Sequence, residues 1–139
     1  MKVLTIKEPF AALIANKVKK IETRSWKTKY RGEIYIHAGV AKVDKRVSAI
    51  PGLKELYENL DLKYGYIICK AKLVDCVYMD EVFMSEIKKD KTEYICGHYE
   101  IGRYAWILDD VEIIEPIKAK GQLLSLIHIS EPTRHSLIS

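Results

Sequence analysis

Apolar and polar residues alternate over several short stretches of the chain, while two other stretches show helical spacing. Alternation places successive side chains on opposite faces of a strand, whereas apolar residues three and four apart share one face of a helix. This pattern predicts strands at residues 3–6, 20–26, 33–38, 64–77, 103–108 and 111–115. It predicts helices at residues 9–16 and 41–60, the second interrupted at Pro51-Gly52. Residues 79–89 fit a short helix followed by a solvated loop.

The order of these elements predicts the fold class. Five to six short strands with two or three flanking helices, and no repeating strand–helix alternation, are typical of a small α+β domain around a curled sheet or β-barrel. Asp109 and Asp110 are expected to form the turn between the last two strands. Residues 1–123 have the usual length of one domain, and no second domain is indicated.

Residues 124–139 follow the predicted domain. Their beginning, LSLIHISEPTR, resembles the conceptual translation of the transposase adapter used in preparing sequencing libraries. We therefore predict a non-native tail and exclude it, with His128 and His135, from fold reasoning. A genuine amphipathic tail with a short strand at residues 126–129 is the alternative.

Composition and charge narrow the class of protein. The formal net charge of +4 permits an anionic partner but is far from that of a protein that coats nucleic acid by charge alone. No apolar run approaches the length needed to cross a bilayer and no secretory leader is evident, so a cytoplasmic protein without a membrane partner is expected. Cys96 and His98 form a single Cys-x-His pair, which is too few ligands for structural zinc. We expect no metal and no other cofactor.

Charged residues concentrate at positions 19–26, KKIETRSW, around one predicted strand. Lys20, Glu22 and Arg24 project to one face of that strand. An unpaired charge near a core is costly, so the row has to be solvated, mutually paired or directed at a charged ligand. Lys19 is three residues from Glu22 and can join it only from the turn before the strand. The block fits either a surface ion-pair ladder or a ligand site.

Five motifs occur in a particular order along residues 3–123. They are LTIKEPFA at residues 4–11; Lys19, Glu22 and Arg24 in the pattern G-x-K-x-x-E-x-R, with Lys17 in place of its glycine; YRG at 30–32 with IHA at 36–38; GRYAWIL at 102–108; and KGQL at 120–123. In this order they resemble the ASCH domains, relatives of the PUA-like RNA-binding barrels. The resemblance implies a small PUA-like β-barrel over residues 1–123.

The resemblance also implies a function. ASCH domains are thought to bind RNA or nucleotides in a cleft lined by this Lys, Glu and Arg, and some members deacylate acetylcytidine or are linked to ribonuclease activity. Lys19 and Glu22 fall on the cleft positions. The amidohydrolase branch has threonine where this chain has Glu22, and many relatives have an acidic residue where this chain has Lys72. Both departures disfavour that catalysis.

We therefore expect an RNA- or nucleotide-binding domain. The expected ligand-binding residues are Lys19, Glu22, Arg24, Trp26, Arg31 and Arg103. The alternative is a small metal-independent hydrolase acting on an acylated nucleoside or on RNA, with Lys19 and Glu22 as catalytic residues. Whether the chain is an enzyme stays open, as does its oligomeric state.

Two tryptophans and two histidines have different expected roles. Trp26 is a candidate for stacking on a base, beside the basic residues of the following loop. Trp106 alternates with other apolar residues and is expected in the core. His37 and His98 are lone histidines, for which a structural role is expected.

Overall fold

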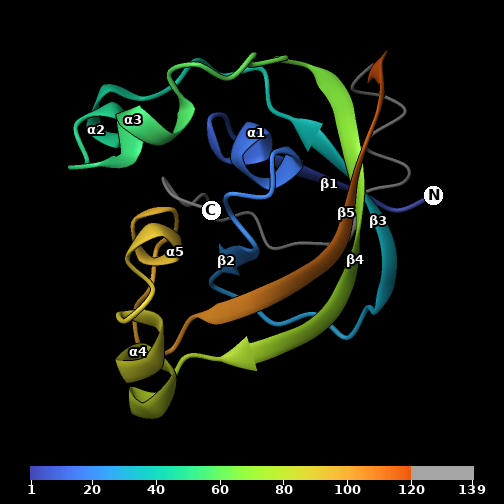
Figure 1. Ribbon diagram of the computed structural model, residues 1–139. Coiled ribbons are helices and arrows are strands. Elements are labelled where there is room, and N and C mark those ends of the chain that lie inside the picture. The colour runs from blue at the N-terminus through green and yellow to red at the C-terminus, as the bar shows by residue number, and fades with distance from the viewer. Residues whose placement is uncertain (120–139) are drawn as a thin grey trace.

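A strongly curved sheet organises the chain, and the computed structural model describes residues 1–119 (Figure 1). The strands are β1 (Val3–Ile6), β2 (Ile21–Arg24), β3 (Gly32–Ala38), β4 (Tyr66–Tyr78) and β5 (Tyr104–Lys118). The helices are α1 (Phe10–Ala15), α2 (Lys45–Ser48), α3 (Leu53–Tyr57), α4 (Glu81–Ile87) and α5 (Lys91–Ile95). The strand order is β1-β3-β4-β5-β2, with β1 parallel to β3 and the other neighbours antiparallel. The predicted α+β class is confirmed, and the five strands agree with the expected five to six.

The predicted barrel is wrong, because the sheet stays open between its edge strands β1 and β2. Each of these strands has only four residues. Between them, the guanidinium Nη2 of Arg24 on β2 donates to the carbonyl of Thr5 on β1 over 3.0 Å. At this point the two edges are joined by a side chain, where a closed barrel has a backbone ladder.

The predicted turn at Asp109-Asp110 is also wrong. Both residues lie inside β5, a continuous strand of 15 residues. Asp110 has a φ of 49°, and the β4–β5 register shifts between Lys70 and Lys72 opposite it. An irregularity of this kind bends a strand without ending it, so the two predicted strands are one.

Residues 1–119 contain five short helices in place of the predicted two or three. The stretch 41–60 divides into α2 and α3 around Pro51-Gly52, as the break predicted. The additional helix α5 begins at Lys91, at the end of the charged run 88–91 that is expected to be a solvated loop. It begins there because the Asp90 carboxylate accepts a hydrogen bond from the Glu93 amide, 3.1 Å away, and so caps the helix.

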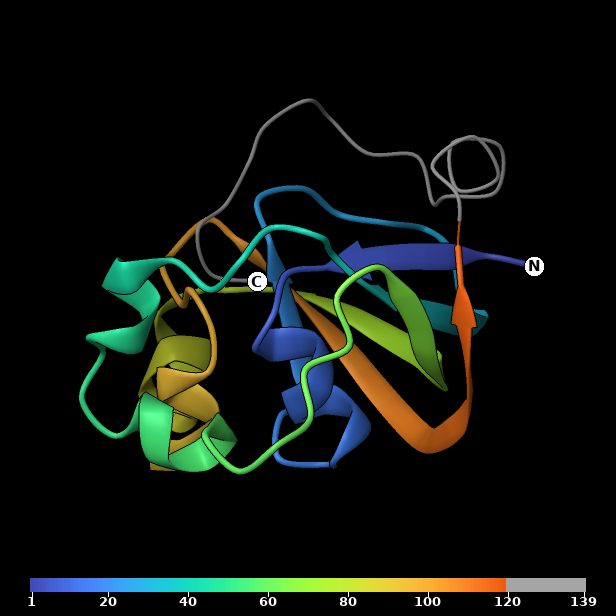
Figure 2. The same cartoon turned by 90° about the horizontal axis from the view of Figure 1, so that it is seen from above.

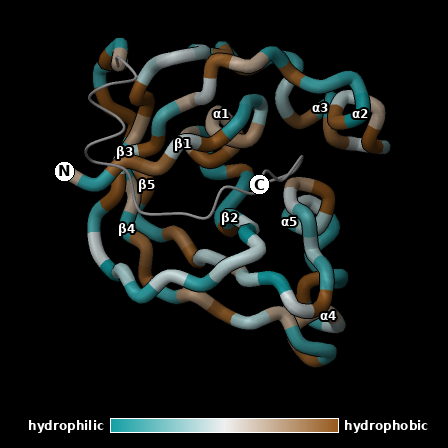
Figure 3. The backbone as a smooth tube through the Cα atoms, turned by 180° about the vertical axis from the view of Figure 1, so that it is seen from behind, coloured by the Kyte–Doolittle hydropathy of each residue, from teal (hydrophilic) through white to brown (hydrophobic). Residues whose placement is uncertain are grey.

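Helix α1 lies in the concavity of the sheet, with the long strands on one side and the four other helices on the other (Figures 1, 2 and 3). All six of its residues are buried. They pack with apolar side chains from β1, β3, β4 and β5, including Leu4, Ile6, Ile34, Ile36, Leu73 and Trp106. Trp106 is fully buried, which confirms its predicted place in the core.

Two sequence-based predictions concern the chain ends and the membrane. The predicted non-native tail at residues 124–139, with the KGQL motif, lies outside the described residues. Within residues 1–119, no helix has the length and apolar character needed to cross a membrane.

Candidate functional site

The turn after α1 places Lys19 in front of β2. Lys17 has a φ of 62°, and the amides of Val18 and Lys19 both donate to the Leu13 carbonyl, at 2.9 and 3.1 Å. A left-handed residue closing a helix in this way is usually glycine, because glycine has no Cβ to clash with the following carbonyl. The glycine of the pattern G-x-K-x-x-E-x-R thus corresponds to a left-handed position, which Lys17 fills in this chain. Lys19 therefore lies before the strand, as its approach to Glu22 requires.

Lys19 is fully buried, which is unusual for a lysine. Its Nζ donates to the Cys96 carbonyl over 2.6 Å and lies 5.6 Å from the centroid of the Phe10 ring. Burial lowers the pKa of Lys19, and the nearby carboxylates of Glu22 and Glu93 partly oppose this effect. The lysine is thus held in a site that favours its neutral form more than water does.

Glu22 and Arg24 form a buried ion pair on one face of β2. The Glu22 Oε2 accepts from the Arg24 Nε over 2.8 Å and lies 2.6 Å from Nη2. Glu22 is fully buried and Arg24 is 9% exposed. The other carboxylate oxygen, Glu22 Oε1, is buried and has no hydrogen-bond partner among residues 1–119.

Arg103 joins this pair from the segment just before β5. Its Nε donates to the His98 carbonyl over 2.9 Å, and the residue is 9% exposed. Burial lowers the pKa of Arg103, while the Glu100 and Glu22 carboxylates raise it. Glu22 thus lies within electrostatic range of both Lys19 and Arg103.

Trp26 lies two residues beyond Arg24, just after the end of β2. Its ring centroid lies 5.4 Å from the Arg24 Cζ, a cation–π geometry. It also packs edge-on against Trp106 with centroids 6.1 Å apart. The ring is half-buried, so Trp26 lies at the boundary between the core and the surface.

Arg31 is not brought to the other predicted site residues. It is exposed, donates to the carbonyls of Thr28 and Tyr30, and lies 3.7 Å from the Asp75 carboxylate. It belongs to the connection between β2 and β3.

Glu93 belongs to the site but was missed by the sequence reasoning, which assigned no element and no role to it. Its carboxylate accepts from the amides of Lys20 and Ile21, at 2.8 and 3.3 Å, and so caps the start of the edge strand β2. Burial raises the pKa of Glu93, and Lys19 opposes the rise. The available signal was the spacing Asp90-x-x-Glu93, typical of a helix start. We call Lys19, Glu22, Arg24, Glu93 and Arg103 the charged cluster.

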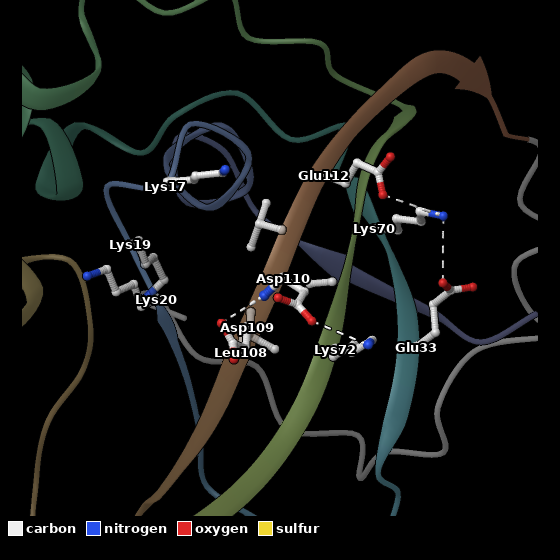
Figure 4. A pocket seen from close by; sticks show the side chains of 12 residues that line it. Lys17, Lys19, Lys20, Glu33, Lys70, Lys72, Leu108, Asp109, Asp110 and Glu112 are labelled. Atoms are coloured by element: carbon white, nitrogen blue, oxygen red, sulfur yellow. Dashed lines mark hydrogen bonds and ion pairs between the residues drawn. The ribbon is translucent and has the colours of Figure 1, made fainter.

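A second feature is an open groove of about 670 Å³ beside the bend of β4 and β5 (Figure 4). Its lining joins Lys17, Lys19 and Lys20, from the turn before β2, to lysine and acidic side chains of β3, β4 and β5, several of which are already paired. Lys70 lies 3.7 Å from both Glu33 and Glu112, and Lys72 lies 3.3 Å from Asp110. Lys72 is thus part of this groove.

Comparison with known proteins assigns the family. The ASCH domain matches residues 4–120, and the chain belongs to this family. ASCH domains are PUA-like and are generally associated with RNA binding. The chain is also similar to human activating signal cointegrator 1, with 28% identity over 81 residues. That match covers 53% of this chain and 14% of the length of the human protein.

Proposed function

We propose that this ASCH domain binds RNA or a nucleotide at the charged cluster. The observation that carries the proposal is the buried Glu22–Arg24 pair beside the half-buried Trp26, with Lys19 and Arg103 within electrostatic range of Glu22. The basic groups are donors suited to phosphate, sugar and base oxygens, and an indole offers a face for stacking. Buried charges are costly unless paired, so a cluster that gathers them next to the surface is better explained by a ligand than by stability.

The groove at β4–β5 is a weaker candidate for this role. Lys70 and Lys72 already face acidic partners, so these two cations are less available to phosphates. The groove lining, five lysines against four acidic side chains, has the same formal net charge of +1 as the charged cluster and shares Lys19 with it. The charged cluster contains three basic and two acidic side chains, Lys19, Arg24 and Arg103 against Glu22 and Glu93.

Fluorescence anisotropy with labelled single-stranded RNA octamers at low salt tests the proposal. Lys19→Met with Arg103→Gln removes two cluster cations, and Lys54→Met with Arg46→Gln removes two exposed cations as a charge-matched control. The cluster variant is expected to bind RNA at least about tenfold more weakly, because each of its two substitutions removes a charged hydrogen bond to the ligand. The control variant is expected to change the affinity by less than about threefold. Undetectable binding of both RNA and nucleosides by the wild type contradicts the proposal. Equal losses in the two variants do so as well.

A second candidate function is metal-independent hydrolysis of an acylated nucleoside or of RNA. The observation in its favour is Lys19, whose lowered pKa and proximity to Glu22 suit proton transfer. Incubation with acetylcytidine and with labelled RNA, followed by mass spectrometry of the products, tests this function. If the wild-type protein turns over neither substrate faster than Lys19→Ala does, the hydrolase function is excluded.

A further inference from the structure

We propose that Glu22 is a specificity-determining residue that selects a base with an exocyclic amino group, such as adenine or cytosine, by accepting one of its N–H groups at Oε1. The inference rests on the proposed binding function and adds to it the class of base.

The hydrogen-bonding state of Glu22 is the first argument. Its Oε2 is engaged by Arg24, whereas Oε1 is buried without a partner among residues 1–119. A buried polar atom without a partner carries a desolvation penalty that a ligand group of matching type relieves. An ionised carboxylate only accepts hydrogen bonds, so the matching ligand group is a donor.

The second argument is that the carboxylate is held in place. Glu22 lies opposite Trp106 in the β2–β5 ladder, which fixes its backbone. Arg24 fixes Oε2 from one side and is itself held by the Thr5 carbonyl, 3.0 Å from its Nη2. An acceptor fixed in this way discriminates between ligands better than a mobile one, because it does not rotate to present another atom.

The charge of Glu22 is the third argument. A carboxylate repels a phosphate, so the part of an RNA that contacts Glu22 is a base edge or a ribose hydroxyl. Amino groups distinguish cytosine from uracil and adenine from hypoxanthine, and each of these pairs otherwise has a similar shape. Carboxylate side chains accept from the amino group of cytosine in nucleic-acid recognition. The neighbouring Trp26, also at the surface boundary, is placed to stack on the same or the next base.

The test compares matched RNA octamers that differ in the amino group: oligo-C with oligo-U, and oligo-A with oligo-inosine. Wild-type protein is expected to bind the amino member about tenfold more tightly in at least one pair. The same preference is expected in 2′-deoxy octamers, because a base donor does not depend on the ribose hydroxyl. Equal affinities within both pairs overturn the inference. A preference lost in the deoxy series also overturns it and assigns the contact to the ribose.

Glu22→Gln then assigns the preference to Glu22. A glutamine presents either a carbonyl or an amide N–H, so the preference for the amino base is expected to fall close to one. Glu33→Gln removes an exposed carboxylate from the groove and serves as the control. This variant is expected to keep the full preference for the amino base. A folded Glu22→Gln protein with an unchanged preference overturns the inference. If the variant does not fold by circular dichroism, the wild-type comparison decides. Failure of every octamer to bind contradicts the proposed function instead.

Discussion

The buried pair of Glu22 and Arg24 makes a quantitative prediction about stability. Arg24→Met removes the charged hydrogen bonds to Glu22 and the bond to the Thr5 carbonyl, while it keeps most of the apolar volume of the stem. Glu22 is fully buried and then loses its cation. Breaking a buried ion pair by removing one partner typically costs about 3–5 kcal/mol. We expect the free energy of unfolding to fall by about that amount.

A double variant separates the interaction energy of the Glu22–Arg24 pair from the effects of the two single substitutions. Glu22→Leu together with Arg24→Met replaces both charges by apolar groups, and such replacements of buried pairs are often close to neutral. The double variant is therefore expected to be more stable than Arg24→Met alone, and the two substitutions to be non-additive by about 1–3 kcal/mol.

Denaturant unfolding of the wild type, the two single variants and the double variant measures this cycle, with equal m-values as the condition for comparing them. The reasoning is refuted if Arg24→Met costs less than about 1 kcal/mol, as an exposed pair would. It is also refuted if the two substitutions add independently.

Two further predictions concern the turn and the cap around β2. Lys17→Gly removes the steric strain of a side chain at a left-handed backbone position and is expected to raise the free energy of unfolding by up to about 1 kcal/mol. A decrease in stability contradicts the left-handed turn at residue 17. Glu93→Gln keeps an acceptor for the Lys20 amide but no longer titrates. Because the folded-state pKa of Glu93 is raised, its protonated form is favoured by folding. The wild type should gain stability relative to Glu93→Gln as pH falls from neutral toward the ordinary glutamate pKa of about 4.3, and lose that gain as pH rises through the folded-state pKa. Thermal melts over this range check the slope, and the opposite sign contradicts the burial of Glu93.

Local patterns predicted the elements well, because strands and helices depend mainly on the spacing of apolar residues. The alternation in residues 33–38 and 64–77 corresponds closely to β3 and β4, and the break at Pro51-Gly52 separates two helices. Closure of the sheet was not predictable in this way. It depends on whether two distant edges, β1 and β2, meet through their backbones or through the Arg24 side chain.

The candidate site was predictable where it lies in one segment. Lys19, Glu22 and Arg24 are close in sequence, and the requirement that Lys19 precede the strand could be stated in advance. Glu93 was missed because the charged run at residues 88–91, just before it, indicated a solvated loop, whereas Asp90 in that run starts a helix that brings Glu93 to β2. The bend at Asp110 was missed because two adjacent aspartates are also the signature of a turn.

A titration of ¹⁵N-labelled protein with an RNA octamer, followed by amide chemical shifts, tests the central claim that the charged cluster is the binding site. We expect the largest and saturable shifts at the amides of β2 and Trp26, and at His98 and Arg103. Shifts confined to Lys70, Lys72 and the bend of β5 would place the RNA in the groove and contradict the account.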